Sequence, residues 1–519
     1  MRKIFLSFVP HQPVQFSMHI IDLSIFILYM IGMLGVGFYF LRKNTGTDDY
    51  YVGGRGMGSG HIGLSVVATD VGGGFSIGLG GLGFVMGLSG SWMLFTGLIG
   101  AWLAAVFLIP RIKNDSAFAK FLTFPQLFEH FFNRKVAIVA AVISAIGYAG
   151  FTSSQILAGA KLANGTFASI SQGQALVVMG AIAVIYTAVG GIKAVIYTDT
   201  IQWILLLAGL IFIGLPMGYK AVGGWEAIQA TLKPEMLRLD NVAGTDLINW
   251  AVTIIPIWFV GMTLYQRIYA ARDTASAKRA WYLAGLFEWP IMAFMGVALG
   301  LLARVAADQG MFAYLGPENI SATDPETGLA LLLRTILPTG LMGLMMAAYF
   351  SAILSTADSC LMASSGNITT DLISRILKMD PGHPKMLRIS QLVTLILGAV
   401  AVSIAYIATN VLDLMLLSYG FLVSGLFVPV VAALANQPLS PTAAMMAMLG
   451  GGTTTAVLGL LSAEAEGFPF GLDPEIFQIT LPFGLDPNVF GIAVALILYV
   501  VGNVLFPKKQ ELTYSTSTS

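Results

Sequence analysis

The chain has 519 residues, of which 56% are hydrophobic and only 10% charged, and its mean hydropathy is +0.80. This combination lies outside the range of soluble globular domains and indicates a polytopic membrane protein. Basic and acidic residues balance at 27 each, so net charge indicates no nucleic-acid partner, and the single cysteine, Cys360, excludes an intrachain disulfide framework.

Apolar segments long enough to cross a bilayer follow one another along most of the chain. A transmembrane helix needs about 20 mostly apolar residues, and thirteen segments meet this requirement. They are residues 19–41, 59–87, 90–110, 134–163, 171–190, 194–218, 246–268, 280–306, 330–375, 387–408, 411–435, 441–462 and 488–506. No stretch resembles a separate soluble domain. We expect residues 1–18 to form an N-terminal tail and residues 508–519 a cytoplasmic C-terminal tail.

The basic residues predict how these spans are oriented. With the N-terminus outside and the C-terminus inside, 19 of the 27 lysines and arginines fall on cytoplasmic connections. We therefore predict a multi-pass protein of the plasma (inner) membrane. We expect it to contact the lipid bilayer, and the sequence indicates no obligate protein partner.

Two spans carry features that interrupt a helix. In the second span, Asp70 and Val71 precede three glycines, at 72–74, which favour unwinding and free backbone carbonyls for ligation. In the seventh span, Pro256 removes a helical hydrogen bond and Gly261 follows. These interruptions lie five spans apart. Interrupted helices at matching positions predict a transporter built from two inverted repeats of five helices, with its site at mid-membrane.

A stripe of hydroxyl groups surrounds one carboxylate in the ninth span. On a helix, Ala352, Ser355, Asp358 and Ser359 share one face. Hard oxygen ligands on one face suit a small hard cation, and an ionisable residue at membrane depth usually marks ion or substrate traffic.

Two further carboxylates lie inside apolar spans. Asp70 sits at the glycine break and Asp199 follows Thr198 in the sixth span, whereas Glu288 stands alone and is expected to make a structural contact. Buried acids must be paired, protonated or bound to a cation. Together with Asp358, these residues favour an ion pathway.

A sodium shell is available from residues at the break and on the stripe. Na⁺ is held best by about five or six oxygens. The carbonyls of Ala68 and Val71, together with Ala352, Ser355 and Thr356, can supply such a set.

Six stretches of the chain resemble one known family in sequence and in order. They are TDDYYVGGRGMG (47–58), SVVATDVGGG (65–74), TFPQLFEHFF (123–132), YTAVGGIKAVIYTDTIQ (186–202), QRIYAARD (266–273) and SAILSTADSCLMASS (351–365). The chain resembles the sodium:solute symporter family, which includes the bacterial proline and sialic acid carriers and the animal glucose and choline carriers.

The resemblance implies an all-α, LeuT-type fold and transport coupled to an ion. A leading helix and cytoplasmic loop would occupy residues 19–58, a ten-helix core 59–436, and two trailing helices 437–507. The coupling ion would be Na⁺. Matched by motif, its site would comprise Ala68, Val71, Ala352, Ser355 and Thr356.

A second cation position occurs in some members of the family. Matched by motif, it would involve Thr198, Asp199, Asp358 and Ser359, while Asp70 matches an acid that the proline carriers have at the break and many relatives lack. Whether a second Na⁺ or a proton is also transported is left open.

The substrate cavity is expected between the two breaks and the fourth, eighth and eleventh spans. No arginine lies between residues 135 and 161, where the sialic acid carriers place their carboxylate-binding arginine, which argues against sialic acid bound in that way. The alternatives are an interhelical hydrogen bond for Gln155 and a packed gate or interface anchor for Tyr419. The candidate cavity residues are Thr69, Phe75, Gln155, Trp258, Tyr265 and Tyr419.

These features favour a secondary active transporter that couples inward Na⁺ movement to uptake of a small polar organic solute by alternating access. A proton-coupled transporter that uses Asp70 or Asp358 is an alternative, and a polytopic enzyme or transporter-like sensor is one from another class. No catalytic constellation is visible, so we do not expect an enzyme. Amino acid, betaine or choline-like amine, monocarboxylate, sugar and vitamin all remain open as solutes, as do the number of ions and the oligomeric state.

Overall fold

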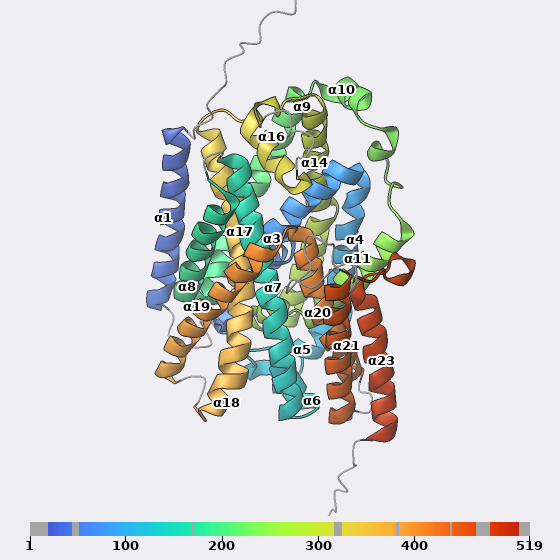
Figure 1. The fold of residues 1–519 in the computed structure, drawn as a ribbon. Coiled ribbons are helices and arrows are strands. Elements are labelled where there is room, and N and C mark those ends of the chain that lie inside the picture. The colour runs from blue at the N-terminus through green and yellow to red at the C-terminus, as the bar shows by residue number, and fades with distance from the viewer. Residues whose placement is uncertain are drawn as a thin grey trace, which may run out of the picture.

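A computed structural model of the chain describes residues 19–43, 51–167, 170–315, 324–379, 383–435, 439–462 and 478–507. Within these ranges every named element is a helix, and the only bridge between extended residues joins Met57 to Ala271. The long helices run roughly side by side (Figure 1). Helices satisfy their backbone hydrogen bonds internally, as a lipid environment requires. The predicted all-helical membrane fold is confirmed.

The helices of the first half surround the first break. They are α1 (Ile20–Lys43), α3 (Ser59–Met86), α4 (Trp92–Leu103) with η3 (Ala104–Leu108) and α5 (Ile109–Lys113), α6 (Pro125–Phe131), α7 (Arg134–Thr166), and α8 (Gln172–Gly209) with η5 (Leu210–Gly214) and α9 (Leu215–Ala221).

The helices of the second half begin with a short peripheral one. They are α10 (Gly224–Thr231), α11 (Gly244–Val260), α12 (Met262–Ala270), α13 (Thr274–Leu286) with η7 (Phe287–Met292) and α14 (Ala293–Asp308), α16 (Gly328–Ile336), α17 (Leu341–Gly366) with η10 (Asn367–Ile373) and α18 (Ser374–Ile376), α19 (Pro384–Ile407), α20 (Val411–Leu434), α21 (Pro441–Leu461) and α23 (Pro487–Leu505).

The number of membrane spans remains a prediction. Among the described residues, nine helices are long and apolar enough to cross a membrane, or ten if α11 and α12 form one broken span, and Ile20–Met33 and Gln172–Ile185 are shorter apolar helices. The predicted spans 171–190 and 194–218 both run into a single element, α8, which continues to Gly209. A drop in hydropathy separates the two segments, but the interval contains no proline that would end a helix.

Both helix breaks are present. In α3 the break falls at Gly72, where φ is 45° and ψ is −173°, a conformation that is essentially restricted to glycine. In the seventh predicted span the break falls at Gly261, between α11 and α12, which meet at 42°. Pro256, which the sequence indicated as part of this break, lies inside α11. Pro256 lacks a backbone N–H, which removes one helical hydrogen bond but leaves the helix intact. At Gly261 the backbone is extended (φ −70°, ψ 111°), and the helix ends there.

Glycines let α3 approach its neighbours closely. A Cβ at Gly73 would overlap Ile353 of α17, and one at Gly83 would lie 2.7 Å from the Cα of Val297 in α14. Small residues permit such backbone contact between membrane helices. The span that contains α17 is also the most enclosed, with 94% of its apolar window buried. The two chain segments predicted to hold Na⁺ therefore meet at the centre of the bundle.

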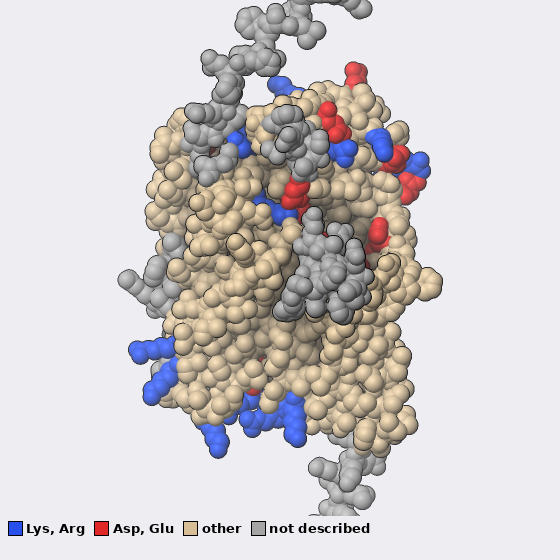
Figure 2. Space-filling model, viewed as in Figure 1, with Lys and Arg blue, Asp and Glu red and all other residues tan. Residues whose placement is uncertain are grey.

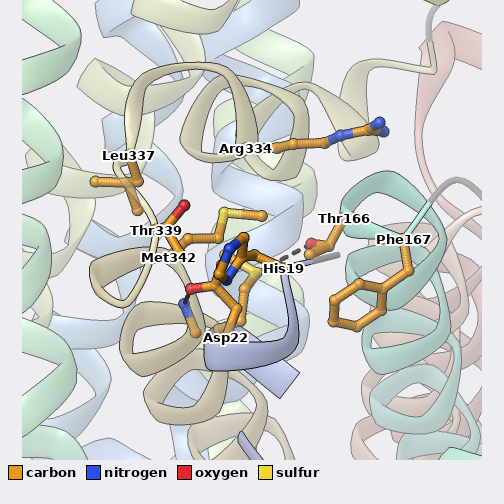
Figure 3. Close-up of a pocket in the computed structure, with 10 residues that line it drawn as sticks. His19, Asp22, Thr166, Phe167, Arg334, Leu337, Thr339 and Met342 are labelled. Carbon is orange, nitrogen blue, oxygen red and sulfur yellow. Dashed lines mark hydrogen bonds between the residues drawn. The ribbon is translucent and has the colours of Figure 1, made fainter. Parts of the chain in front are cut away.

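The leading helix α1 positions the start of α17. Asp22 of α1 accepts hydrogen bonds from the backbone N–H groups of Gly340 and Gly343, both at 2.7 Å. Figure 3 shows its side chain directed at this turn, beside a cavity of about 140 Å³ that His19 and Thr166 also line. A carboxylate at a helix N-terminus stabilises the helix dipole and its free donors. Thus α1 fixes one end of the helix that carries the hydroxyl stripe.

A partly buried ion-pair network ties three further elements together. Lys161 of α7 lies 2.6 Å from Asp324 and from Glu326, which flank the start of η9 (Pro325–Thr327). Glu326 also accepts hydrogen bonds from the first backbone amides of α20, at Val411 (2.9 Å) and Leu412 (3.0 Å). The carboxylate thus satisfies donors that a helix N-terminus leaves free, and it links α7, the segment before α16, and α20.

Candidate functional site

The predicted sodium ligands meet at the contact between α3 and α17. The hydroxyl of Thr356 donates to the carbonyl of Ala68 at 2.7 Å, across the two helices, and lies 3.4 Å from the carbonyl of Ala352. The hydroxyl of Ser355 donates to the same Ala352 carbonyl at 3.0 Å. All four residues are buried. Val71 immediately precedes the Gly72 break, and its side chain lies outside the described part of the structure.

The donor set suits a small hard cation. Carbonyl and hydroxyl oxygens from two helices converge where the break at Gly72 interrupts the helical ladder of α3. The Asp199 carboxyl on α8 lies near Ser355, which brings negative charge close to these neutral oxygens. Oxygen ligands of this kind are those that Na⁺ prefers. The residues present therefore fit Na⁺.

A fully buried arginine occupies the neighbouring space. Arg267 of α12 donates to the hydroxyls of Thr69 (2.6 Å) and Ser359 (2.7 Å), and to that of Ser65 at 3.1 Å. Its Nη2 lies 3.6 Å from Oδ2 of Asp199, and neither side chain is exposed. Two residues of the predicted second cation position, Asp199 and Ser359, thus contact a positive charge that belongs to the protein itself.

The other members of that predicted position have different partners. Asp358 accepts a hydrogen bond from Thr187 of α8. Thr198 donates to the carbonyl of Val195 in its own helix at 3.0 Å. The guanidinium of Arg267 draws Asp199 and Ser359 together, while Asp358 faces another part of α8. A second cation position stays a prediction.

Asp70 belongs to a third group, on the other side of α3. The hydroxyl of Tyr419 in α20 donates to Asp70 Oδ1 at 3.2 Å. The carboxyl of Glu288, in η7, neighbours that of Asp70 where α3 packs against η7. The sequence indicated that Glu288 stands alone, and the structure corrects this, since it lies against the acid at the break.

The remaining cavity candidates have partners within the protein. The side chain of Phe75 is outside the described residues, and Thr69 belongs to the Arg267 group. Whether the others face a solute stays a prediction. Gln155 donates to Ser154 at 3.3 Å, Trp258 lies edge-on to Trp281, and Tyr265 donates to the carbonyl of Phe259 at 3.0 Å while its ring meets that of Phe124.

A cavity lined by acidic residues, here called the vestibule, lies beside α20 near Tyr419. A cavity of about 570 Å³ lies among α11, α20, α21 and the start of α23. Its walls include Asp246, Asp413 and Asp486, and they reach Gly420, the residue after Tyr419. Burial, and then the neighbouring Asp413 and Asp246, raise the pKa of Asp486 to about 6. The vestibule therefore gathers negative charge at neutral pH.

The Asp486→Asn variant should be more stable than the parent protein at neutral pH. A carboxyl whose pKa is raised on folding from 3.8 to about 6 destabilises the protein as the pH rises through that range. Removing the charge should stabilise the fold by about 1 kcal/mol at neutral pH, after allowance for partial exposure, and by nothing near pH ~4. Thermal unfolding at both pH values measures this. An equal gain at both would contradict the electrostatic origin.

Two residues of the site, Arg267 and Thr187, escaped the sequence-based prediction, and a third, Glu288, was expected only to make a structural contact. Arg267 and Glu288 are charged residues in or beside apolar spans, and this position alone could have indicated a functional role for both. Thr187 shows no such sign, since a hydroxyl in an apolar helix is common and usually bonds within its own helix.

Broken helices, carbonyl and hydroxyl oxygens at the break, and the all-helical bundle together define a secondary transporter with a LeuT-type fold. Residues 50–451 match the Sodium:solute symporter family, and the chain belongs to that family. It is a membrane protein that couples uptake of a small solute to Na⁺, and it is a transporter rather than an enzyme. The fold implies alternating access.

Relatives and solved structures agree with this assignment. The chain is 27% identical over 445 residues to the osmoregulated proline transporter OpuE of Bacillus subtilis (strain 168), covering 83% of this chain and 87% of OpuE. It is 27% identical over 393 residues to the sodium/proline symporter of Escherichia coli (strain K12), covering 73% and 76%.

Two solved structures share the fold. A Na⁺-coupled sialic acid symporter in a substrate-bound, outward-open state superposes with a TM-score of 0.72 at 21% identity, covering 94% of this chain and 99% of that one. Mhp1, a nucleobase-cation-symport-1 family transporter in a closed conformation, gives a TM-score of 0.51 at 13% identity, covering 89% and 96%.

Proposed function

We propose that the coupling Na⁺ binds at the contact of α3 and α17, with Ala68, Val71, Ala352, Ser355 and Thr356 as its ligands. The observation that carries this proposal is the 2.7 Å approach of the Thr356 hydroxyl to the Ala68 carbonyl, immediately before the Gly72 break. In this role Na⁺ joins the broken helix to α17.

Binding of Na⁺ would order the broken helix and raise the affinity for the solute. Linkage requires the solute to raise the affinity for Na⁺ by the same factor. Rocking of one bundle of helices against the other would then expose both ligands to the inside. The core that moves comprises residues 59–436, with the leading segment 19–58 and the trailing helices 437–507 outside it.

We further propose that the N-terminus lies outside and the C-terminus inside. Figure 2 supports this orientation, since the charged side chains visible at the lower end are almost all basic, whereas the upper end shows acidic and basic ones together. Basic ends of helical bundles face the cytoplasm. The helix α1 begins at the acidic end and α23 finishes at the basic end (Figure 1).

For the solute, we propose an amino acid of the proline type. This rests on the relatives named above as proline transporters, at 27% identity. L-Proline is therefore the first substrate to assay.

The double variant Ser355→Ala and Thr356→Ala should need a higher Na⁺ concentration for uptake. Removing two hydroxyl ligands leaves the ion with too few oxygens, so the Na⁺ concentration for half-maximal uptake should rise at least roughly tenfold. Uptake of labelled L-proline into cells, measured against Na⁺ concentration, tests this. Ser403→Ala with Thr454→Ala is a matched control, because both hydroxyls bond only to carbonyls of their own helices in the described structure.

The outcome that overturns this site is an unchanged Na⁺ dependence in the Ser355/Thr356 variant. Proton coupling through Asp70 or Asp358 predicts something different: uptake that persists without Na⁺ and follows the pH gradient.

A further inference from the structure

Two buried carboxyl groups face each other beside the first helix break. Asp70, in α3, is 3% exposed, and Glu288, in η7, is completely buried. The two carboxyl groups are neighbours where α3 packs against η7. Two such groups cannot both carry their charge in apolar surroundings unless a positive charge lies near them.

The protein supplies no such charge at this place. Across the described residues, no lysine, arginine or histidine forms an ion pair with either carboxyl, and Arg267 is engaged by Asp199. The titratable groups that face Asp70 are Tyr148 of α7, Cys360 of α17 and Tyr419 of α20, all neutral at physiological pH.

Several oxygens of the pair lack a donor. Oδ2 of Asp70 and both carboxyl oxygens of Glu288 accept no hydrogen bond from another described residue. Buried acceptors are normally satisfied, and each one that is not costs free energy. Three unpartnered acceptors in one place point to a ligand that brings donors.

Two glycines of α4 leave room for the side chains of Glu288 and Trp258. A Cβ at Gly97 of α4 would overlap Glu288 Oε2, and one at Gly100 would lie 3.0 Å from the indole nitrogen of Trp258. Glu288 and Trp258 thus pack on one glycine face of α4. On the opposite side, the ring of Phe151 lies 4.7 Å from that of Tyr419. Aromatic faces favour a neighbouring cation.

The acid-lined vestibule lies close to this pair along the chain. Its walls include Gly420, the residue after the tyrosine whose hydroxyl binds Asp70. Asp246, Asp413 and Asp486 line the same cavity. Clefts lined by charges of one sign concentrate ligands of the other sign, so this cavity favours cations near Tyr419.

We infer that Asp70 and Glu288 bind the protonated amine of the transported solute. The unpartnered oxygens accept N–H donors, so the solute carries a primary or secondary ammonium group, and anionic and uncharged solutes are excluded. A quaternary ammonium satisfies the charge but leaves the acceptors empty, and it binds more weakly. This inference rests on the proposed symport, with Na⁺ bound separately at Thr356.

A thermal-shift panel on the purified full-length protein tests the charge requirement without any substitution. The amine probes are L-proline and L-alanine, and the comparison probes are N-acetyl-L-proline, choline, pyruvate and D-glucose, each tested in Na⁺ and in K⁺. The expected result is stabilisation by at least one amine probe in Na⁺, with less from choline and none from the others.

The Glu288→Gln variant tests the residue itself. Loss of a charge-assisted hydrogen bond should raise the Kd of the amine probe roughly 10- to 100-fold, while the stabilisation by Na⁺ alone stays within about twofold of the parent value. Glu226→Gln, on the peripheral helix α10, is the matched control and should change neither.

Four results would overturn the inference. One is stabilisation by N-acetyl-L-proline, pyruvate or D-glucose, or by no amine probe at all. Another is an unchanged Kd in Glu288→Gln, and the third is an equal loss of Na⁺ binding in that variant, which would make the pair a sodium site. If Glu288→Gln does not fold, the parent-protein panel decides alone. Na⁺-dependent uptake of an uncharged solute would overturn this inference while leaving the proposed symport intact.

Discussion

Replacing Gly72 with alanine should abolish Na⁺-coupled uptake. At φ 45° and ψ −173°, only glycine is unstrained, and an added Cβ would lie 2.8 Å from Cγ2 of Thr356 and overlap its hydroxyl oxygen. Backbone strain of about 1–3 kcal/mol and overpacking of about 1–3 kcal/mol both fall on the proposed sodium ligands. Because about 1.4 kcal/mol is a factor of ten, we expect uptake to fall roughly 100-fold or more.

A second glycine of the same helix provides the control. A Cβ at Gly60 has no atom within 4 Å, so Gly60→Ala should fold and transport normally, with a small gain from the better helix former. Uptake of labelled L-proline against Na⁺ concentration and the Tm of the purified protein are measured for both variants. Parent-like Na⁺ dependence in Gly72→Ala would show that the break does not shape the ion site.

The sequence predicted those parts of the site that local chemistry encodes. Consecutive glycines after Asp70 indicated the break in α3, because glycine tolerates a backbone conformation that other residues avoid. Helical spacing placed Ser355 and Ser359 on one face with Ala352. In the structure Ser355 donates to the Ala352 carbonyl, and Ser359 accepts a hydrogen bond from Thr69 of α3. Each of these features depends on residues a few positions apart in the chain.

The rest depends on pairing between distant segments. Arg267 contacts Ser65, about 200 positions earlier in the chain, and nothing near either residue in the sequence specifies the other. The same holds for Asp70 and Glu288, which come together because α3 packs against α14 and η7. A sequence reveals that a buried charge needs a partner. Only the fold determines which partner it has.

The break in the seventh span shows a finer limit. Proline was the more conspicuous residue, yet the helix continues through Pro256 and ends at Gly261. One missing donor is tolerated when the flanking turns remain helical. The backbone of Gly261 is one that any residue can adopt, but a Cβ there would lie 3.1 Å from the carbonyl oxygen of Ile257 and 3.2 Å from the hydroxyl of Tyr148. The position of this break therefore depends on close packing, which the sequence does not specify.

Replacing Arg267 with methionine should strongly destabilise the protein. The guanidinium is fully buried, lies 3.6 Å from Asp199, and donates to the hydroxyls of Thr69 and Ser359. Removing one partner of a buried ion pair leaves the other charge uncompensated, at a cost of about 3–5 kcal/mol. Arg267→Lys keeps the charge but not the planar fork, so it should be intermediate. Thermal unfolding of the purified variants measures both effects.

A double-variant cycle separates the ion pair from general loss of packing. If the unpaired Asp199 carboxylate causes the damage, Asp199→Asn should recover a large part of the stability that Arg267→Met loses, with a coupling energy of about 1–3 kcal/mol. The exposed Arg304–Asp308 pair, at 2.9 Å, is the matched control, and the same cycle there should give below about 0.5 kcal/mol. If Asp199→Asn gives no recovery, Arg267 stabilises the protein by packing and not by its charge. The guanidinium would then not take the place of a cation beside Ser359.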